Sequence, residues 1–332
     1  MLYDLQMGQP LALFVFDDPD SADTRAALAA LGNNKSNREQ ITCIALVRGT
    51  PAQCNGLVNA ASSELTVLAD DGAVTAHLLG PGPAGQRLIT AFALDPNLRV
   101  IERIEHSANG SLTQFLQRVT AVYSGAVPRT PQILQQQAPV LFIPRVLDAG
   151  FCTELITYFE QVGGQPSGTA YIEGDKALWR LDPAVKMRRD VYIKEGAWLE
   201  RVKEVLVRRV LPEIKLCFQY QVTQHEVFKL VCYDAQTGGY FHPHRDNESR
   251  DTQHRRFAMT LNLNTGDYTG GQLHFPEFGA DLYAPERGDA IIFSSSLLHE
   301  VMPVTAGKRY VLLGFFFGDA ESIAPVKYVP TH

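Results

Sequence analysis

The sequence predicts a two-domain α+β protein, with an α/β sandwich over residues 1–125 and an antiparallel β-sandwich or barrel with supporting helices over residues 139–332. Its 332 residues exceed the usual size of one domain, and a hydrophobic fraction of 45% with 20% charge supplies two packed cores. Apolar runs alternate with helical patterns in the first part and follow one another between turns in the second. Residues 126–138 (AVPRTPQILQQQA) are rich in Pro and Gln without periodicity, which predicts a linker.

In the N-terminal part, two short β-rich runs flank a helical pattern. Residues 11–17 (LALFVFD) and 41–48 (ITCIALVR) are predicted strands, and residues 20–32 a helix, which makes a βαβ unit. Further short strands and turns are predicted at residues 65–71, 73–80, 88–96 and 98–105, followed by a helix over residues 111–125. A small central sheet covered by helices accommodates this order.

The C-terminal part opens with helical patterns over residues 148–162 and 195–218. Short β-runs, separated by Gly, Asp, Asn and Pro turns, then follow at residues 227–234, 255–264, 270–276, 289–295, 299–304 and 309–317. Such a series predicts an antiparallel sandwich or barrel supported by the preceding helices.

Composition excludes several classes of protein. A net charge of -6 argues against an electrostatic grip on nucleic acid, which needs a basic face. The chain lacks about 18 consecutive apolar residues, and its first residues lack a basic segment before a short apolar run, so a soluble protein without membrane contact is expected. The odd number of scattered cysteines, with no CxxC pair, predicts neither a disulfide framework nor a zinc knot and favours a reducing cytoplasm.

A candidate metal site begins in the segment YFHPHRDNES, where His244 and Asp246 lie two residues apart and share one face of an extended chain. His299, between strand-like flanks, is expected to face them across a barrel. Two imidazoles and one carboxylate are the facial triad of non-haem Fe(II) oxygenases, which leaves positions open for a chelating cosubstrate and O2. His242 is the rival ligand, but Pro243 makes a regular strand doubtful there and favours a rim position for His242.

Arg309 follows His299 by ten residues in a further apolar run. Its guanidinium can bind a carboxylate through two hydrogen bonds, so a cosubstrate that chelates iron through a 2-oxo acid and presents a distal carboxylate fits this order. Tyr233 can donate a further hydrogen bond to that carboxylate. Arg188 and Arg189 either line the substrate mouth or form an ordinary charged strand edge.

These segments resemble the prolyl 4-hydroxylase-like branch of the Fe(II)/2-oxoglutarate-dependent oxygenases. The resemblance extends from about Val140 to Gly318, through VLFIPRVLDAGFCTELI, LVCYDAQTGGYFHPHRDN, LNLNTGDYTGGQLHFPEFG and GDAIIFSSSLLHEVMPVTAGKRYVLLGFFF. It implies a double-stranded β-helix (jelly roll), in agreement with the strand pattern.

The resemblance also implies the roles of five residues. His244, Asp246 and His299 would be catalytic iron ligands, and Arg309 would bind the C5 carboxylate of 2-oxoglutarate with help from Tyr233. The implied reaction is hydroxylation of an unactivated C–H bond with succinate and CO2 as co-products. Its cofactors would be Fe(II), 2-oxoglutarate and O2, with ascorbate as reductant.

The sequence departs from the family pattern at one position. Animal members have a tyrosine that touches 2-oxoglutarate where this chain places Asn262, which makes Asn262 a further candidate contact to the cosubstrate. The carboxylate position is kept as Asp246 rather than vacated for a halide, so the resemblance favours hydroxylation over halogenation.

The N-terminal 125 residues are similar to a thioredoxin-fold domain of peroxiredoxin type, notably in LALFVFDDPDSADTRAALAAL and LTVLADDGAVTAHLLG. The stretch in which such enzymes hold their attacking thiolate reads DDPDSADTR and has no cysteine. Peroxide chemistry then lacks its nucleophile, so the domain is expected to be catalytically silent and to serve docking or dimerisation.

Three functions follow as hypotheses. The first is a hydroxylase whose substrate is a prolyl residue of a protein or peptide, with a free amino acid or small metabolite as the alternative. The second is a partner-binding or sensing protein whose oxygenase domain is subsidiary. The third, a thiol peroxidase, would require peroxide turnover dependent on Cys43 or Cys54. Pairing through exposed strand edges of the N-terminal domain would give a homodimer.

Overall fold

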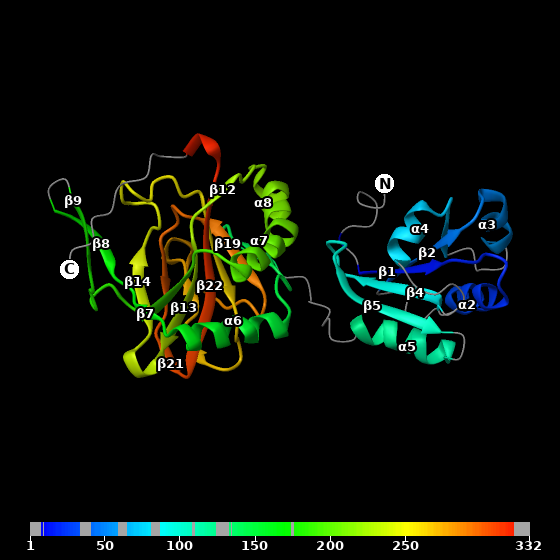
Figure 1. Cartoon of the computed structure of the whole chain (residues 1–332), viewed down its shortest axis with the longest axis horizontal. Helices are drawn as coiled ribbons and strands as arrows, with labels where there is room; N and C mark the ends of the chain where they lie inside the picture. The colour runs from blue at the N-terminus through cyan, green and yellow to red at the C-terminus, as the bar shows by residue number, and fades with distance from the viewer. Residues whose placement is uncertain are drawn as a thin grey trace. The chain divides into compact units, whose positions relative to one another are not determined.

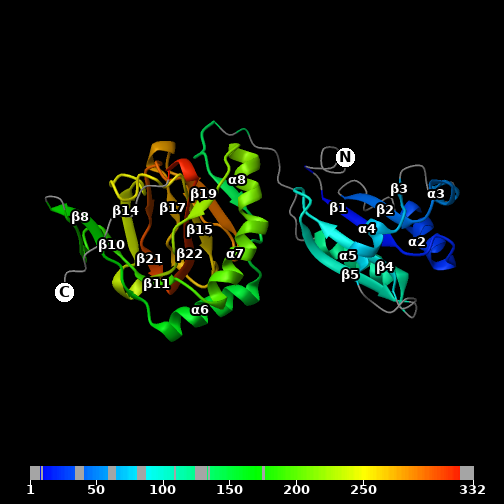
Figure 2. The ribbon, with the colours of Figure 1, turned by 45° about the horizontal axis from the view of Figure 1, so that its top comes forward.

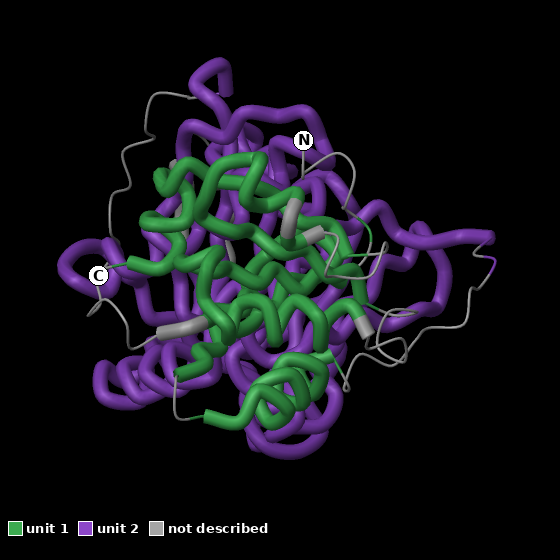
Figure 3. The backbone as a smooth tube through the Cα atoms, turned by 90° about the vertical axis from the view of Figure 1, so that its right-hand side faces the viewer, with its two compact units in different colours: residues 1–131 green, residues 132–332 purple. Residues whose placement is uncertain are grey.

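The computed structural model describes residues 8, 10–33, 41–58, 65–80, 87–107, 110–123, 133, 135–173 and 176–321. The chain divides into two compact units, Met1–Pro131 and Gln132–His332, which Figure 3 colours separately. Most of the linker expected over residues 126–138 lies outside the described residues.

The first unit is built on one mixed sheet (Figure 1). Its elements are β1 (Leu11–Phe16), α2 (Ala22–Asn33), β2 (Thr42–Arg48), α3 (Pro51–Val58), β3 (Thr66–Asp70), α4 (Ala73–Leu79), β4 (Arg87–Leu94), β5 (Val100–Ser107) and α5 (Leu112–Tyr123). The strand order is β3-β2-β1-β4-β5. β1, β2 and β3 run parallel to one another, whereas β4 is antiparallel to β1 and β5 is antiparallel to β4.

Alternate side chains of β1 enter cores on the two faces of this sheet. Phe14 packs with Leu28 of α2 and Phe115 of α5. Val15, on the other face, belongs to a smaller cluster against which Leu79 of α4 packs. This alternation follows from the period of two in an extended chain, and it is why β1 is apolar at nearly every position.

Helix α4 replaces the strand expected within residues 73–80, so that prediction is wrong. The cause is Asp70, whose carboxylate accepts hydrogen bonds from the backbone N–H of Gly72 (3.1 Å) and of Thr75 (2.7 Å) and from the Thr75 hydroxyl (2.6 Å). These bonds satisfy N–H groups that a helix start leaves open. The same bonds, led by the Thr75 hydroxyl, hold the pKa of Asp70 below its usual range.

The second unit contains helices α6 (Ala149–Val162), α7 (Ala197–Arg209) and α8 (Leu211–Phe218). Its strands are β6 (Leu141–Ile143), β7 (Gln165–Pro166), β8 (Thr169–Glu173), β9 (Lys176–Arg180), β10 (Lys186–Met187), β11 (Arg189–Ile193), β12 (Gln224–His225), β13 (Phe228–Asp234), β14 (Tyr240–His244), β15 (Phe257–Asn262), β16 (Thr269–Gly270), β17 (Leu273–His274), β18 (Leu282–Tyr283), β19 (Ala290–Ser294), β20 (His299–Val301), β21 (Val304–Ala306) and β22 (Lys308–Phe317).

Two sheets form the body of this unit. The larger sheet has the order β6-β19-β15-β22-β13-β11-β7, with β12 paired to β22, and the smaller has the order β10-β14-β20-β17-β18. Val231 and Val311 of the larger sheet share one core cluster with Leu273 and Val301 of the smaller sheet. Helices α6, α7 and α8 pack on the other face of the larger sheet (Figure 2). This mixed, strand-rich fold is consistent with the jelly roll expected from the sequence.

The helix predicted over residues 148–162 is confirmed, because α6 begins after Asp148, whose carboxylate accepts a hydrogen bond from the N–H of Phe151 (2.8 Å). The prediction of one helix over residues 195–218 is wrong, because Val210 separates α7 from α8. Pro212 has no backbone N–H to continue the hydrogen-bond ladder, so the helix ends and restarts around it.

Leu312 is fully buried in β22, opposite Leu230 of β13 and Leu261 of β15. Leu312→Ala should lower the free energy of unfolding of the second unit by about 2–5 kcal/mol, because it removes buried methyl groups and leaves a cavity. Urea unfolding followed by tryptophan fluorescence measures this, since Trp179 and Trp198 both belong to this unit.

The control for that experiment is Leu216→Ala, which alters a leucine 54% exposed on α8. Its effect should stay within about 0.5 kcal/mol. Equal losses from the two variants would contradict the placement of Leu312 at the centre of the core.

Candidate metal centre

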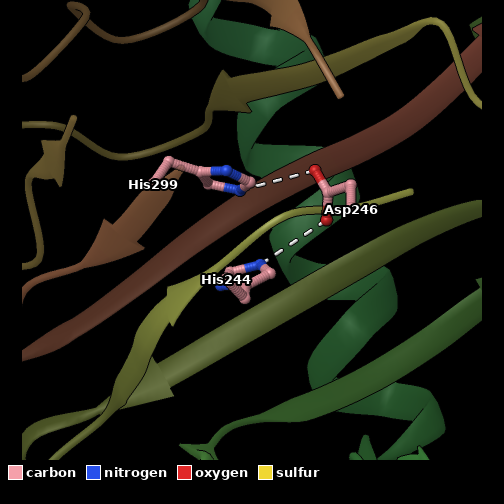
Figure 4. A group of neighbouring side chains, drawn as sticks. All are labelled: His244, Asp246 and His299. Atoms are coloured by element: carbon pink, nitrogen blue, oxygen red, sulfur yellow. Dashed lines mark ion pairs between the residues drawn. The ribbon is translucent and has the colours of Figure 1, made fainter. Parts of the chain in front are cut away.

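Strand pairing brings the three candidate ligands together (Figure 4). His244 on β14 lies directly opposite His299 on β20 in the antiparallel register. Asp246 follows β14 by two residues, and its backbone N–H donates to the carbonyl of Ser295 (2.9 Å). One ligand atom from each of the three side chains lies within 4.8 Å of the others.

Backbone carbonyls orient both imidazole rings. Nδ1 of His244 lies 2.8 Å from the carbonyl oxygen of His242, and Nδ1 of His299 lies 2.9 Å from that of Leu297. If each Nδ1 carries the proton, it donates to that carbonyl and each Nε2 keeps a lone pair. The two Nε2 atoms face the carboxylate of Asp246, at 3.5 Å for His244 and 3.4 Å for His299.

This spacing suits a single small cation. Two ligand atoms that each lie about 2.1 Å from an ion, at right angles to one another, are about 3 Å apart. The distances from Nε2 of His244 to Oδ1 of Asp246 (3.5 Å) and from Nε2 of His299 to Oδ2 of Asp246 (3.4 Å) are close to that value. Two imidazole nitrogens and one carboxylate are also the donor set of a facial triad. The three side chains therefore fit a first-row divalent metal such as iron.

The electrostatics of the centre favour the protonation states that bind a metal. Burial opposes ionisation of Asp246, but the imidazoles of His299 and His244 hold its pKa well below the usual range. Burial lowers the pKa of His299, against the opposing charge of Asp246. A bound cation would take the place of the imidazole protons beside the ionised carboxylate.

A cavity of about 960 Å³ opens onto this centre. The three candidate ligands line it together with Tyr233. Aromatic and aliphatic side chains form much of the wall near the ligands, namely Phe241, Leu273, Phe293 and Val301. Apolar walls with a few convergent polar groups are typical of small-molecule and cofactor sites.

Arg309 lies opposite Tyr233 in the pairing of β22 with β13, and its guanidinium carbon is 5.4 Å from the Tyr233 ring centroid. The side chain is 1% exposed. Its Nη2 donates to Oδ1 of Asn262 (3.0 Å), whereas its Nε has no hydrogen-bond partner among the described residues. A buried guanidinium with an unused N–H is suited to an anionic ligand, although Arg309 is not among the residues that line the cavity.

Asn262 also lies outside the cavity lining, and protein groups occupy both ends of its amide. Its nitrogen donates to the hydroxyls of Thr265 (3.0 Å) and Tyr268 (3.2 Å) and to the carbonyl of Pro285 (3.0 Å), and its oxygen accepts from Arg309. In this arrangement Asn262 positions Arg309, and direct contact between Asn262 and a cosubstrate stays a prediction.

Close approach of the backbone also constrains Arg309. Gly271 has a φ of +70°, and a Cβ there would lie 2.8 Å from Cδ of Arg309 and 2.9 Å from Cγ2 of Val304. Only glycine fits this position without moving the arginine.

Arg188 lines the cavity, and its role at the substrate mouth stays a prediction. Its guanidinium lines the cavity, pairs with Asp190 (3.1 Å), donates to the hydroxyl of Tyr233 (3.2 Å) and lies 5.2 Å from the Phe241 ring centroid. Arg189 instead lies over Phe159 of α6, as strand alternation requires. Arg188 and Asp190 are two residues apart, so in an extended chain their side chains share one face, and this spacing could have indicated an ion pair.

Other polar residues were missed or fall elsewhere. Lys186 and Lys229 line the cavity, but single lysines in β-runs carry no sequence signal that separates them from a solvated edge. His242 is exposed and contributes its carbonyl to the centre, in agreement with the expected rim position.

Comparison with known proteins finds a family match within the second unit. Residues 228–317 match the model of the 2OG-Fe(II) oxygenase superfamily. The chain is 25% identical over 189 residues to the multifunctional procollagen lysine hydroxylase and glycosyltransferase of Caenorhabditis elegans, covering 55% of this chain and 24% of that protein. It is 33% identical over 118 residues to a PKHD-type hydroxylase of Acaryochloris marina, covering 35% of this chain and 51% of that protein.

The chain thus spans about a quarter to a half of the length of these curated relatives. The family match covers residues 228–317 of the 332, and the curated relatives that align with the chain are hydroxylases, which supports an enzyme. Solved structures that resemble the chain include a Pseudomonas putida prolyl-4-hydroxylase (18% identity, TM-score 0.41, 55% of this chain and 94% of that one). A Trichoplax adhaerens prolyl hydroxylase in complex with a hypoxia inducible factor peptide also aligns (21% identity, TM-score 0.43, 55% of this chain and 84% of that one).

Within the described residues, no helix is both long enough and apolar enough to cross a membrane.

Asn262→Leu should lower the free energy of unfolding by about 1–3 kcal/mol, because it removes the acceptor of a buried guanidinium N–H. Gln236→Leu, at an exposed position of the same unit, is the control and should change stability by less than about 0.5 kcal/mol. Urea unfolding measures both variants. A neutral effect of Asn262→Leu would show that the hydrogen bond to Arg309 does not stabilise this end of the sheet.

Proposed function

We propose that the chain is an Fe(II)- and 2-oxoglutarate-dependent oxygenase that hydroxylates an unactivated C–H bond, with succinate and CO2 as co-products. The observation that carries the proposal is the cluster of His244, Asp246 and His299, with both Nε2 atoms facing the carboxylate at the wall of a cavity. The family match of residues 228–317 encloses all three side chains.

In this proposal three residues hold the metal and two bind the cosubstrate. When bound, Fe(II) supplies the redox chemistry that couples oxidation of 2-oxoglutarate to hydroxylation of the substrate. His244, Asp246 and His299 hold the metal, and the carbonyls behind the two imidazoles fix ring orientation. Arg309 binds the distal carboxylate of 2-oxoglutarate, helped by Tyr233, and the unused Nε of Arg309 supports this role. Ascorbate would act as reductant.

We further propose that the substrate is a residue of a protein or peptide, with a prolyl residue as the first choice. The support is that the curated relatives of this chain include procollagen lysine hydroxylases and a PKHD-type hydroxylase. Hydroxylation of a free amino acid or small metabolite is the alternative, because the cavity volume suits either.

The first unit is proposed to be a thioredoxin-like module without catalytic activity that docks a partner or forms a homodimer. Its sheet order, with β4 and β5 antiparallel beside the parallel β1 and β2, supports the fold. Helix α2 has no cysteine at its N-terminus. Cys54 is buried, and burial raises the pKa of its thiol, which disfavours a reactive thiolate.

The test is succinate formation from 2-oxoglutarate by protein loaded anaerobically with Fe(II) and then exposed to air, with and without ascorbate. Wild type should form succinate. His244→Ala should lose at least about 100-fold, because a ligand is missing. Arg309→Ala should raise the KM for 2-oxoglutarate by about 100-fold, because a buried carboxylate loses its charged partner.

His274→Ala is the matched control for the histidine variant. His274 pairs with Glu300 (2.8 Å) and does not line the cavity, so this variant should keep wild-type succinate formation. If wild type neither turns over 2-oxoglutarate nor binds iron with it, the enzyme proposal fails and the partner-binding function takes its place.

The silent first unit gives a separate prediction. Wild type should consume hydrogen peroxide no faster than the variant Cys43→Ser with Cys54→Ser, because Cys43 lies within strand β2 and burial raises the pKa of the Cys54 thiol. Peroxide loss measured in the presence of dithiothreitol checks this. Rapid consumption that the double variant abolishes would make the first unit a thiol peroxidase.

A further inference from the structure

The cavity next to the metal centre is unusually cationic for this chain. Seven of its lining residues are lysines or arginines and four are acidic, although the whole chain has a net charge of -6. Asp246, one of the four, is a candidate metal ligand and would be neutralised by the ion. The remaining walls therefore present an excess of positive charge.

The buried arginines of this cavity already have carboxylate partners. Arg188 pairs with Asp190 at 3.1 Å. Arg255 binds Glu226 through two hydrogen bonds, of 2.6 and 2.8 Å. Their charges are balanced within the protein, so neither requires a ligand.

Lys186 and Lys229 differ from the arginines. Among the described residues, neither ammonium has a carboxylate oxygen within 4.0 Å. Lys186 is only 9% exposed and lies 5.1 Å from the ring centroid of Phe241. Lys229 lies 5.3 Å from the ring centroid of Tyr192 and 5.7 Å from that of Phe315.

Crowding of these cations has an electrostatic cost that an anion would relieve. Burial, followed by the charge of Arg188, lowers the pKa of Lys186 to about 7. Burial and Arg188 also lower the pKa of Lys229. A buried ammonium without a counter-ion is unfavourable, and an anionic ligand would restore its charged form.

The proposed 2-oxoglutarate site does not account for the two lysines. Arg309 lies opposite Tyr233, and Lys229 precedes Tyr233 by four residues on the same strand, β13. At about 3.3 Å per residue, the Cα atoms of Lys229 and Tyr233 are about 13 Å apart. Lys229 therefore lies at a different position along the strands from Arg309, which would bind the distal carboxylate.

Lys186 is linked to the metal centre through Phe241, and Lys229 lines the same cavity. Phe241, which underlies the ammonium of Lys186, stacks on His244 with ring centroids 3.4 Å apart. A molecule whose anionic group lies at Lys186 can therefore extend along Phe241 toward the candidate ligands.

We infer that the substrate carries a carboxylate that binds between Lys186 and Lys229, so that the enzyme acts on an acidic substrate. The inference rests on the proposed function and deepens it, because it assigns the substrate class of the same site. The carboxylate could belong to an Asp or Glu side chain of a peptide or to a free carboxylic acid, and both are anions of the same chemistry.

The experiment measures succinate formation by the iron-loaded full chain in two arms. The peptide arm compares N-acetylated, C-amidated pentapeptides with a central proline, flanked either by Asp and Glu or by Asn and Gln. The free-acid arm compares a pool of L-amino acids with the same pool as carboxamides. In at least one arm the acid form should stimulate succinate formation about tenfold more than its amide. The arm that responds identifies the source of the carboxylate.

The double variant Lys186→Gln with Lys229→Gln should reduce this acid-to-amide ratio to near one, whereas Lys186→Arg with Lys229→Arg should retain a preference for the acid. Lys203→Gln is the matched control and should keep the wild-type ratio. Lys203 lies on α7, beside Glu200 at 3.5 Å, and does not line the cavity. Retention of charge in the arginine pair separates loss of binding from loss of folding.

Equal stimulation by acids and amides in both arms would overturn the inference. So would a rise in the KM for 2-oxoglutarate in the glutamine double variant, because the lysines would then serve the cosubstrate. Failure of the proposed function has a different signature, since wild type would then form no succinate and bind no 2-oxoglutarate under any condition.

Discussion

The metal centre depends on the antiparallel pairing of β14 with β20. This pairing sets His244 opposite His299. Beyond β14, the backbone N–H of Asp246 donates a hydrogen bond to the carbonyl of Ser295, which places Asp246 beside the two histidines. Carbonyls of the same two segments lie next to the Nδ1 atoms of both rings. Backbone geometry therefore decides where the imidazoles lie and which nitrogen faces the centre, before any metal arrives.

The larger sheet separates packing from binding by simple alternation. On β13, Leu230 and Cys232 enter the core beneath the helices, whereas Lys229 and Tyr233 line the cavity. The same rule places Arg309 on the inner face of β22. One face of each strand thus packs in the hydrophobic core, and the other face carries charged groups. Burial of these charged groups costs free energy unless a partner or a ligand compensates their charge.

The errors made from sequence have local causes. Residues 73–80 contain apolar and β-branched side chains typical of a strand, but the hydrogen bonds of Asp70 start a helix there. Residues 195–218 keep helical periodicity across Pro212, yet the missing N–H divides the segment into α7 and α8. Hydrophobic periodicity in a sequence indicates which face of an element is apolar. The start and the end of a helix depend on single polar atoms, which this periodicity does not include.

The sequence by itself determined the candidate metal site of His244, Asp246 and His299, because two imidazoles and one carboxylate are the donor set of a facial triad. Only the tertiary structure decided the partners of the remaining polar groups. Arg188 forms an ion pair with Asp190, whereas neither Lys186 nor Lys229 pairs with a carboxylate in the part of the chain that the structure describes. The physical reason is that ion pairing and burial depend on distances between strands far apart along the chain, and periodicity along one strand does not contain that information.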